Sequence, residues 1–307
     1  MEIRLAEKAG FCFGVKRAVD TVLELTQTER KVYTYGPIIH NETVVADLAS
    51  RGVSVLSEED SIDAVTEGTI VIRSHGVSKA VWENLKRREE ETGGKVKIVD
   101  ATCPFVKKIH NTVERESLAG KQIIICGDDS HPEVIAIKGW CAAPAIVIAS
   151  VEEAAALSGN LPESVCIVSQ TTFNYNKFKT IIAFFDSLGY DKNDSVVNTI
   201  CNATEERQTE ANRLAKACDA MVVIGSRSSS NTRKLYEICR QACPNAFLIQ
   251  SADDLDHSAF QSFRCVGITA GASTPRNIIE EVQNRMSEEN FEQMLEQSFK
   301  TIHNGEV

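Results

Sequence analysis

Three cysteines occupy matching places in three similar stretches of the chain, where their thiols can do metal or redox chemistry. Cys12, Cys103 and Cys201 each follow a strand-like apolar run and precede apolar residues at helical spacing. A glycine stands 24 residues after each of them, and these glycines are Gly36, Gly127 and Gly225. Because the same spacing occurs three times, the sequence predicts an internal repeat with one cysteine in each copy.

A thiol between a strand and a helix lies near backbone N–H groups and the positive end of the helix, which favour the thiolate. Three thiolates brought together can bind zinc with an open position, hold three irons of a four-iron cluster, or carry out thiol chemistry. The other cysteines have no such counterparts. We expect Cys126, Cys166 and Cys265 to be core residues and Cys239 and Cys243 to pack on a helix, and Cys141 and Cys218 give no signal.

Hydrogen-bond donors follow the strand ends in the same repeats. His40, His131 and Ser229 stand four residues after the three glycines. Histidine, serine and asparagine side chains at such loops can surround an anion, and helices that begin nearby add N–H groups. We therefore predict a phosphate or diphosphate site without arginine clamps, formed by His40, His75, His131, Ser229, Ser230, Asn231 and Ser273.

Two further polar residues in these loops have two interpretations each. Glu133 is a helix N-terminal acid or a proton donor, and Thr171 caps a helix or positions a substrate hydroxyl. The remaining histidines, His110, His257 and His303, have no comparable context.

The elements that position these residues alternate between strand and helix, which predicts an α/β fold with parallel sheets and right-handed crossovers. The run Glu2–Leu5 has no unit before it, and the third unit has no strand after its last helix. We therefore expect this strand to complete the third unit. The prediction is three pseudo-equivalent αβ domains arranged as a trefoil around a central cluster: 14–102, 103–200, and 1–13 with 201–286, followed by a tail over 287–307.

Serine followed by acids marks an expected helix start in each unit. These motifs are Ser57-Glu58-Glu59-Asp60, Ser150-Val151-Glu152-Glu153 and Ser251-Ala252-Asp253-Asp254. The tail has apolar residues at helical spacing, which indicate either a docked or a frayed helix: Phe291, Met294, Leu295 and Phe299.

Composition narrows the class of protein. The 307 residues carry a net charge of −10, which argues against nucleic acid as the main partner. We expect no membrane span, because the longest uncharged run, Gly139–Val151, is short and contains Pro144. Because no export signal is visible, we expect a cytoplasmic protein with reduced cysteines. Two basic pairs, Lys16-Arg17 and Lys107-Lys108, follow cysteines and could dock an acidic protein.

Several motifs, in order from Met1 to about Met286, together resemble the 4-hydroxy-3-methylbut-2-enyl diphosphate reductase family, iron–sulfur enzymes that end the non-mevalonate isoprenoid pathway. The motifs are Gly10-Phe11-Cys12-Phe13-Gly14-Val15, Ile39-His40-Asn41, Ser74-His75-Gly76-Val77-Ser78, Asp100-Ala101-Thr102-Cys103-Pro104, His131-Pro132-Glu133-Val134, Gln170-Thr171-Thr172, Ile200-Cys201-Asn202-Ala203-Thr204, Gly225-Ser226 with Ser229-Ser230-Asn231, and Thr269-Ala270-Gly271-Ala272-Ser273.

The resemblance implies a [4Fe–4S] cluster held by Cys12, Cys103 and Cys201, with one iron open to the substrate. It implies two electrons from ferredoxin or flavodoxin, and loss of the substrate's C4 hydroxyl as water to give isopentenyl and dimethylallyl diphosphate. Glu133 with His131 would serve proton transfer, Thr171 would lie beside the hydroxyl, and the anion-binding residues given above would hold the diphosphate. We expect a monomer or weak homodimer. Two alternatives stay open: an iron–sulfur hydro-lyase, which needs no external reductant, and a non-enzymatic iron–sulfur sensor.

Overall fold

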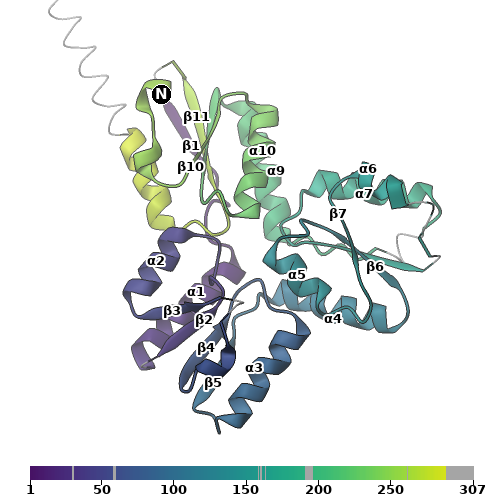
Figure 1. The fold of residues 1–307 in the computed structure, drawn as a ribbon. Coiled ribbons are helices and arrows are strands. Elements are labelled where there is room, and N and C mark those ends of the chain that lie inside the picture. The colour runs from purple at the N-terminus through teal and green to yellow at the C-terminus, as the bar shows by residue number, and fades with distance from the viewer. Residues whose placement is uncertain are drawn as a thin grey trace, which may run out of the picture. The chain divides into compact units, whose positions relative to one another are not determined.

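The computed structural model describes residues 1–29, 31–57, 60–157, 159, 161–162, 164–190, 196–260 and 262–287. The expected tail helix and two acids of the first serine–acid motif lie outside them: Phe291, Met294, Leu295, Phe299, Glu58 and Glu59. The chain divides into two compact units, Met1–Phe11 with Glu206–Val307, and Cys12–Glu205. Each unit is an α/β structure built on parallel strands (Figure 1).

The unit that contains both ends of the chain has one four-stranded sheet of order β1-β11-β9-β10. Its strands are β1 Glu2–Leu5, β9 Ala220–Ile224, β10 Ala246–Ile249 and β11 Cys265–Ala270. Glu2 of β1 pairs in parallel with Cys265 of β11, so the N-terminal strand extends the sheet of the last repeat (Figure 1). The helices are α10 Ser230–Ala242, residues 276–287, and most of α9 Asn202–Ala217, with short 3-10 helices η2 Ala252–Asp254 and η3 His257–Phe260.

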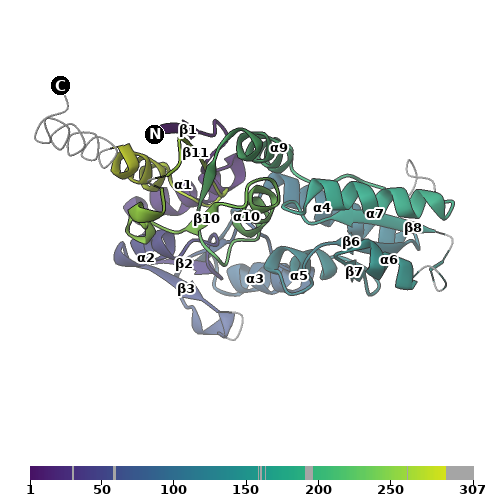
Figure 2. The same cartoon turned by 90° about the horizontal axis from the view of Figure 1, so that it is seen from above.

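The larger unit holds two sheets, of order β3-β2-β4-β5 and β7-β6-β8. Their strands are β2 Val32–Tyr35, β3 Val53–Leu56, β4 Gly68–Ile72, β5 Val96–Asp100, β6 Gln122–Cys126, β7 Ile146–Ile148 and β8 Val165–Ser169. The helices are α1 Phe13–Thr28, α2 Glu42–Ser50, η1 Ile62–Ala64, α3 Lys79–Glu91, α4 Pro104–Leu118, α5 Pro132–Lys138, α6 Val151–Leu157 and α7 Tyr175–Ser187 (Figure 2).

The strands β6, β8 and β9 consist mainly of buried apolar residues, as expected for strands of a parallel sheet that is covered on both faces. In β6, Ile124 packs in one cluster with Phe178 and Phe185 of α7, while Ile123 and Ile125 pack on the other face with residues of α4. Successive side chains of a strand point to opposite faces, so one run supplies both cores. The α/β fold class with small parallel sheets is confirmed, and the three-domain boundaries stay a prediction.

Two expectations about local structure differ from the described residues. Before Cys201 the expected strand is reduced to one bridge, between Val196 and Ile167. There the Thr199 hydroxyl, instead of a continued ladder, accepts the Ser169 N–H at 2.7 Å. The serine–acid motif at Ser150 opens the α-helix α6, whereas the one at Ser251 opens the 3-10 helix η2, and the described part of the first motif is followed by the 3-10 helix η1.

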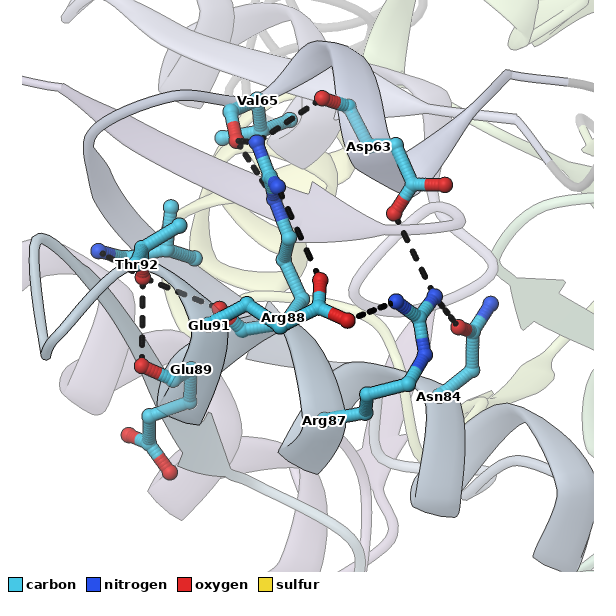
Figure 3. Close-up of polar contacts among 9 residues, drawn as sticks. Asp63, Val65, Asn84, Arg87, Arg88, Glu89, Glu91 and Thr92 are labelled. Atoms are coloured by element: carbon cyan, nitrogen blue, oxygen red, sulfur yellow. Dashed lines mark hydrogen bonds and ion pairs between the residues drawn. The ribbon is translucent and has the colours of Figure 1, made fainter.

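Arginines of α3 tie the segment before β4 to that helix (Figure 3). The Arg88 guanidinium donates to the carbonyls of Val65 and Asp63, at 2.8 Å to each from Nη2. Arg87 donates to the carboxylates of Asp63 and Glu91. These bonds hold η1 against α3, and α3 in turn begins just after the His75 loop.

Candidate active site

The three cysteines of the repeat all lie at helix starts. Cys12 and Cys103 are the residues before α1 and α4, and Cys201 directly precedes α9. Neither Cys12 nor Cys103 uses its side chain to cap its helix, and all three are half-buried free thiols. A helix-start thiol without a capping role is available to a ligand, and the ligand function of these three residues stays a prediction.

Electrostatics show that the three thiols are neighbours. The pKa of Cys103 is raised to about 11, chiefly by burial; the N–H groups of Phe105 and Val106 oppose this shift, and the thiols of Cys12 and Cys201 add to it. Burial also raises the pKa of Cys201, and Cys12 is again among the causes. Three thiols that disfavour one another's ionisation are stabilised as thiolates by a metal, which releases their protons on binding.

Close backbone packing fixes the cysteine positions. Gly14 of α1 faces Cys103, because a methyl group at Gly14 would lie 2.5 Å from the Cys103 Sγ. The Arg17 guanidinium donates to the Thr102 carbonyl. The N–H of Cys103 donates to the Ser74 carbonyl at 3.0 Å, which joins this cysteine to the His75 loop.

The three predicted anion-binding histidines form one cluster. Ring centroids are 4.5 Å apart for His40 and His75, 5.1 Å for His40 and His131, and 5.4 Å for His75 and His131. Burial, and then the nearby imidazoles of His40 and His131, hold the pKa of His75 well below its ordinary value. Its Nδ1 is buried without a hydrogen-bond partner. A buried polar atom without a partner is costly, and a polar ligand would satisfy it.

Glu133 and Thr171 form a buried pair beside this cluster. The Thr171 hydroxyl donates to Glu133 Oε2 at 2.7 Å, and the Thr171 N–H donates to Oε1 at 2.6 Å. The Glu133 N–H donates to His131 Nδ1 at 3.1 Å, which leaves the His131 proton on Nε2. The Cys201 N–H donates to the Thr171 carbonyl at 3.1 Å. The Glu133 carboxylate and the Thr171 hydroxyl are thus bonded to each other, and backbone groups of the same two residues bond to His131 and to Cys201.

The remaining predicted anion-binding residues lie in the other unit. Ser229 caps α10, accepting the Thr232 N–H, and Ser230, Asn231 and Ser273 are all buried. Both amide atoms of Asn231 are buried without partners. The loop that carries Ser273 lies against the start of α10, since a methyl group at Gly271 would meet the Thr232 side chain. The start of α10 and the loop after β11 thus carry the buried polar side chains of this unit that the sequence singled out.

Two kinds of metal ligand are therefore present among the described residues. His40, His75 and His131 have ligand atoms within 4.8 Å of one another. The three cysteines offer soft thiolates, which suit iron–sulfur clusters and zinc. The thiol donors fit an iron–sulfur cluster. The three histidines, with an unsatisfied buried Nδ1 on His75, fit an anion as well as they fit a metal ion.

Comparison with known proteins shows the family of this chain. The family model described as LytB protein matches residues 3–287. The chain belongs to the LytB family. It is 46% identical over 286 residues to the 4-hydroxy-3-methylbut-2-enyl diphosphate reductase of Caldanaerobacter subterraneus subsp. tengcongensis. The matched region covers 92% of this chain and 95% of that reductase. It is 44% identical to the Geobacter sulfurreducens reductase of the same name, over 94% of this chain and 98% of the other.

Two solved structures are similar to the LytB chain. One is described as (E)-4-hydroxy-3-methyl-but-2-enyl diphosphate reductase, the terminal enzyme of the non-mevalonate pathway, with 39% identity, a TM-score of 0.65, and coverage of 94% of this chain and 100% of the other. The other is the E-1-hydroxy-2-methyl-but-2-enyl-4-diphosphate reductase from Plasmodium falciparum, with 28% identity, a TM-score of 0.82, and coverage of 92% and 87%. The family resemblance that the motifs indicated is confirmed.

The structure adds two residues that the sequence reasoning missed. Arg73, 6% exposed, is among the groups that lower the pKa of His75, and a methyl group at Gly36 would collide with its guanidinium. The expectation of an anion site without arginine therefore omitted a cation next to His75. Its place in Arg73-Ser74-His75 was the available signal.

The second is His110, which lies behind the His75 loop. Its ring stacks on Trp140 with centroids 5.2 Å apart, and a methyl group at Gly76 would touch it. It supports the loop that carries His75.

The structure also bears on the predicted burial of the other cysteines and on the membrane prediction. Cys126 and Cys166 are core residues, as expected, whereas Cys265 is half-buried at the start of β11. No described helix is long and apolar enough to cross a membrane. The basic pairs after the cysteines are partly neutralised: Lys16 pairs with Asp20 and Lys107 with Asp100.

Proposed function

We propose that this LytB protein reduces (E)-4-hydroxy-3-methylbut-2-enyl diphosphate to isopentenyl and dimethylallyl diphosphate. The observation that carries the proposal is the buried Glu133–Thr171 pair, bonded on one side to His131 and on the other to the Cys201 loop. A carboxyl group between an anion site and a thiol site is in place to move protons to a leaving hydroxyl. The names of the LytB relatives support the same reaction.

Cys12, Cys103 and Cys201 would hold a [4Fe–4S] cluster, which when bound supplies electrons and one iron corner without a protein ligand. The thiols suit this function because they are half-buried at helix starts and uncommitted to capping. The backbone N–H groups of Phe105 and Val106 act to lower the pKa of Cys103, because their positive dipoles stabilise the thiolate that would bind the cluster.

His40, His75 and His131 would bind the diphosphate, together with Ser229, Ser230, Asn231 and Ser273. The lowered pKa of His75 keeps its imidazole neutral at pH 7, so it contributes a hydrogen bond and no charge. His131 accepts the Glu133 N–H at Nδ1 and therefore presents an Nε2–H donor. Buried Arg73 places a positive charge next to this cluster.

Glu133 would supply protons through Thr171. The carboxylate accepts two bonds from Thr171 and is only 2% exposed, so water does not compete for it. When Glu133 is protonated, its O–H can donate to the Thr171 oxygen, and the Thr171 hydroxyl is then free to donate to the substrate hydroxyl. That hydroxyl leaves as water after it receives the proton.

The physiological partners follow from the electron demand. Two electrons, delivered one at a time, suit ferredoxin or flavodoxin as donor. Phe13 and Phe105 each follow a cysteine closely and are 66% and 42% exposed, which makes their surroundings a suitable approach for such a donor. We further propose a cytoplasmic monomer or weak homodimer with the three αβ domains given by the repeat.

The test is anaerobic turnover of the chain with substrate, with and without a chemical reductant, beside Glu133→Gln and a matched acid variant, Glu114→Gln, on α4. We expect product only when the reductant is present. Turnover should fall by about 10²-fold or more in Glu133→Gln and should be unchanged in Glu114→Gln. Turnover without reductant would favour the hydro-lyase, and no turnover with four irons bound would favour the sensor.

Iron content is measured in parallel for Cys12→Ala, Cys103→Ala and Cys201→Ala. About four irons in the wild type, lost in each variant, would agree with the proposed cluster. A colourless wild type after anaerobic reconstitution would refute it and leave zinc or thiol chemistry.

A further inference from the structure

A second pair of thiols lies far along the chain from the proposed cluster ligands. Cys218 follows the last residue of α9, and Cys265 is the first residue of β11. Their sulfur atoms are 3.2 Å apart, closer than an ordinary packing contact between two thiols. Both residues are half-buried, so a small oxidant can reach them. Both also belong to the same compact unit, so the pair needs nothing from the rest of the chain.

Backbone bonds hold the two cysteines in this arrangement. The Asp219 N–H donates to the Cys265 carbonyl at 2.9 Å, and the Cys265 N–H donates back to the Asp219 carboxylate at 3.0 Å. Two bonds in opposite directions fix the turn after α9 against the start of β11. Closing a 3.2 Å contact to the roughly 2.05 Å of an S–S bond therefore needs only a side-chain adjustment.

A third thiol nearby is directed elsewhere. The Cys243 Sγ donates to the carbonyls of Cys218 and Asp219, at 3.8 and 3.5 Å. It thus bonds to backbone oxygen, whereas the sulfurs of Cys218 and Cys265 contact each other. This leaves Cys218 and Cys265 as a specific pair and makes Cys243 a matched control.

We propose that Cys218 and Cys265 form a reversible dithiol–disulfide site that is oxidised by hydrogen peroxide or a similar small peroxide. In the first step one thiolate attacks a peroxide oxygen, which breaks the O–O bond, gives a sulfenic acid and releases water. In the second step the other thiol attacks the sulfenic sulfur, forms the S–S bond and releases a second water. Two thiols and one peroxide thus give one disulfide and two waters, and a small dithiol reductant reverses the change.

The surroundings assign the order of attack. Burial and the contact with Cys265 raise the pKa of Cys218 to about 12, so Cys218 keeps its proton. Arg4 of the neighbouring strand β1 lies close enough to both thiols to interact with them electrostatically, and Cys265 is the larger influence on Arg4. Because Cys218 keeps its proton, Cys265 supplies the sulfur that attacks the peroxide, and Cys218 resolves the sulfenic acid.

The test treats the full chain with one equivalent of hydrogen peroxide, blocks the remaining thiols by alkylation, and maps the peptides by mass spectrometry. We expect a cross-linked pair of peptides containing Cys218 and Cys265, lighter by two hydrogens, and alkylated Cys243. In Cys218→Ser the sulfenic acid on Cys265 should be trapped by dimedone, whereas Cys265→Ser should give no adduct at Cys218. Cys243→Ser should behave as the wild type.

A second readout does not depend on peptide recovery. Oxidation closes a loop of about fifty residues and should raise the unfolding temperature by roughly 5 °C, reversibly with dithiothreitol, in the wild type and in Cys243→Ser only. Cys141 is also half-buried and serves as a reference for the reach of the peroxide. If Cys141 is oxidised while Cys218 and Cys265 are both still fully alkylated, the proposal is overturned. A Cys218–Cys243 link would overturn it as well.

Discussion

Replacement of Gly14 by alanine gives a sharp test of the proposed cluster site. Gly14 lies in the first turn of α1 and faces Cys103 of α4. The added methyl carbon would lie 2.5 Å from the Cys103 Sγ and 3.1 Å from its Cβ. Non-bonded atoms of this size prefer separations of roughly 3.5–4.0 Å, so the sulfur must move by about 1 Å.

A displacement of this size matters far more to a cluster than to the fold. Metal–ligand distances tolerate about 0.2 Å, so we expect iron affinity to fall by about tenfold or more. Overpacking costs about 1–3 kcal/mol, and alanine in place of glycine inside a helix returns about 0.5–1 kcal/mol. The metal-free variant should therefore remain folded, with an unfolding free energy within about 2 kcal/mol of the wild type.

The assay compares iron per chain and visible absorption after anaerobic reconstitution with urea unfolding of the metal-free protein. Gly267→Ala is the matched control, because its methyl group would lie 2.5 Å from the Met221 sulfur, a similar collision inside the other unit. We expect that control to lose stability while it keeps its iron. Normal iron content in Gly14→Ala, with Gly267→Ala destabilised, would refute the placement of the Cys103 sulfur as a ligand.

Three further predictions follow from particular residues. Burial lowers the pKa of His110 to about 4, so the neutral imidazole contributes its full stability above about pH 6.5 and loses it as the pH falls toward 4, by at most about 3 kcal/mol. The free energy of unfolding, measured in urea, should therefore depend less on pH in His110→Gln than in the wild type. An equal pH dependence in the two proteins would contradict this. Thr171→Val should lower turnover by about 10-fold or more while iron content is kept, because the hydroxyl bonded to Glu133 is lost; unchanged turnover would exclude a Thr171 relay. Phe13→Ala should raise the KM for an acidic protein donor and leave turnover with a small chemical reductant unchanged, and an equal loss with both donors would exclude a docking function.

The repeat was the most informative part of the sequence. Equal spacing of cysteine and glycine predicted an internal repeat, and the alternation of strand and helix predicted the parallel sheets that the structure has. Because the first strand had no unit before it, we predicted that it completes the third unit, and β1 pairs with β11 of that unit. These inferences worked because periodicity and chain order are properties of the sequence itself.

Contacts between residues far apart in the chain could not be obtained in this way. Glu133 and Thr171 were singled out separately, but their bond joins residues 38 positions apart. Arg73 was overlooked and His110 was set aside, because their significance lies in what packs against them, a histidine cluster and a glycine loop.

The cysteines show the same division most clearly. Sequence alone selected Cys12, Cys103 and Cys201, because each stands at the same position of a repeated strand–helix unit. It gave Cys218 no signal and placed Cys265 in the core, whereas their sulfurs are 3.2 Å apart. A repeat fixes which residues are equivalent, but only the pairing of strands and the packing of helix ends decide which side chains meet.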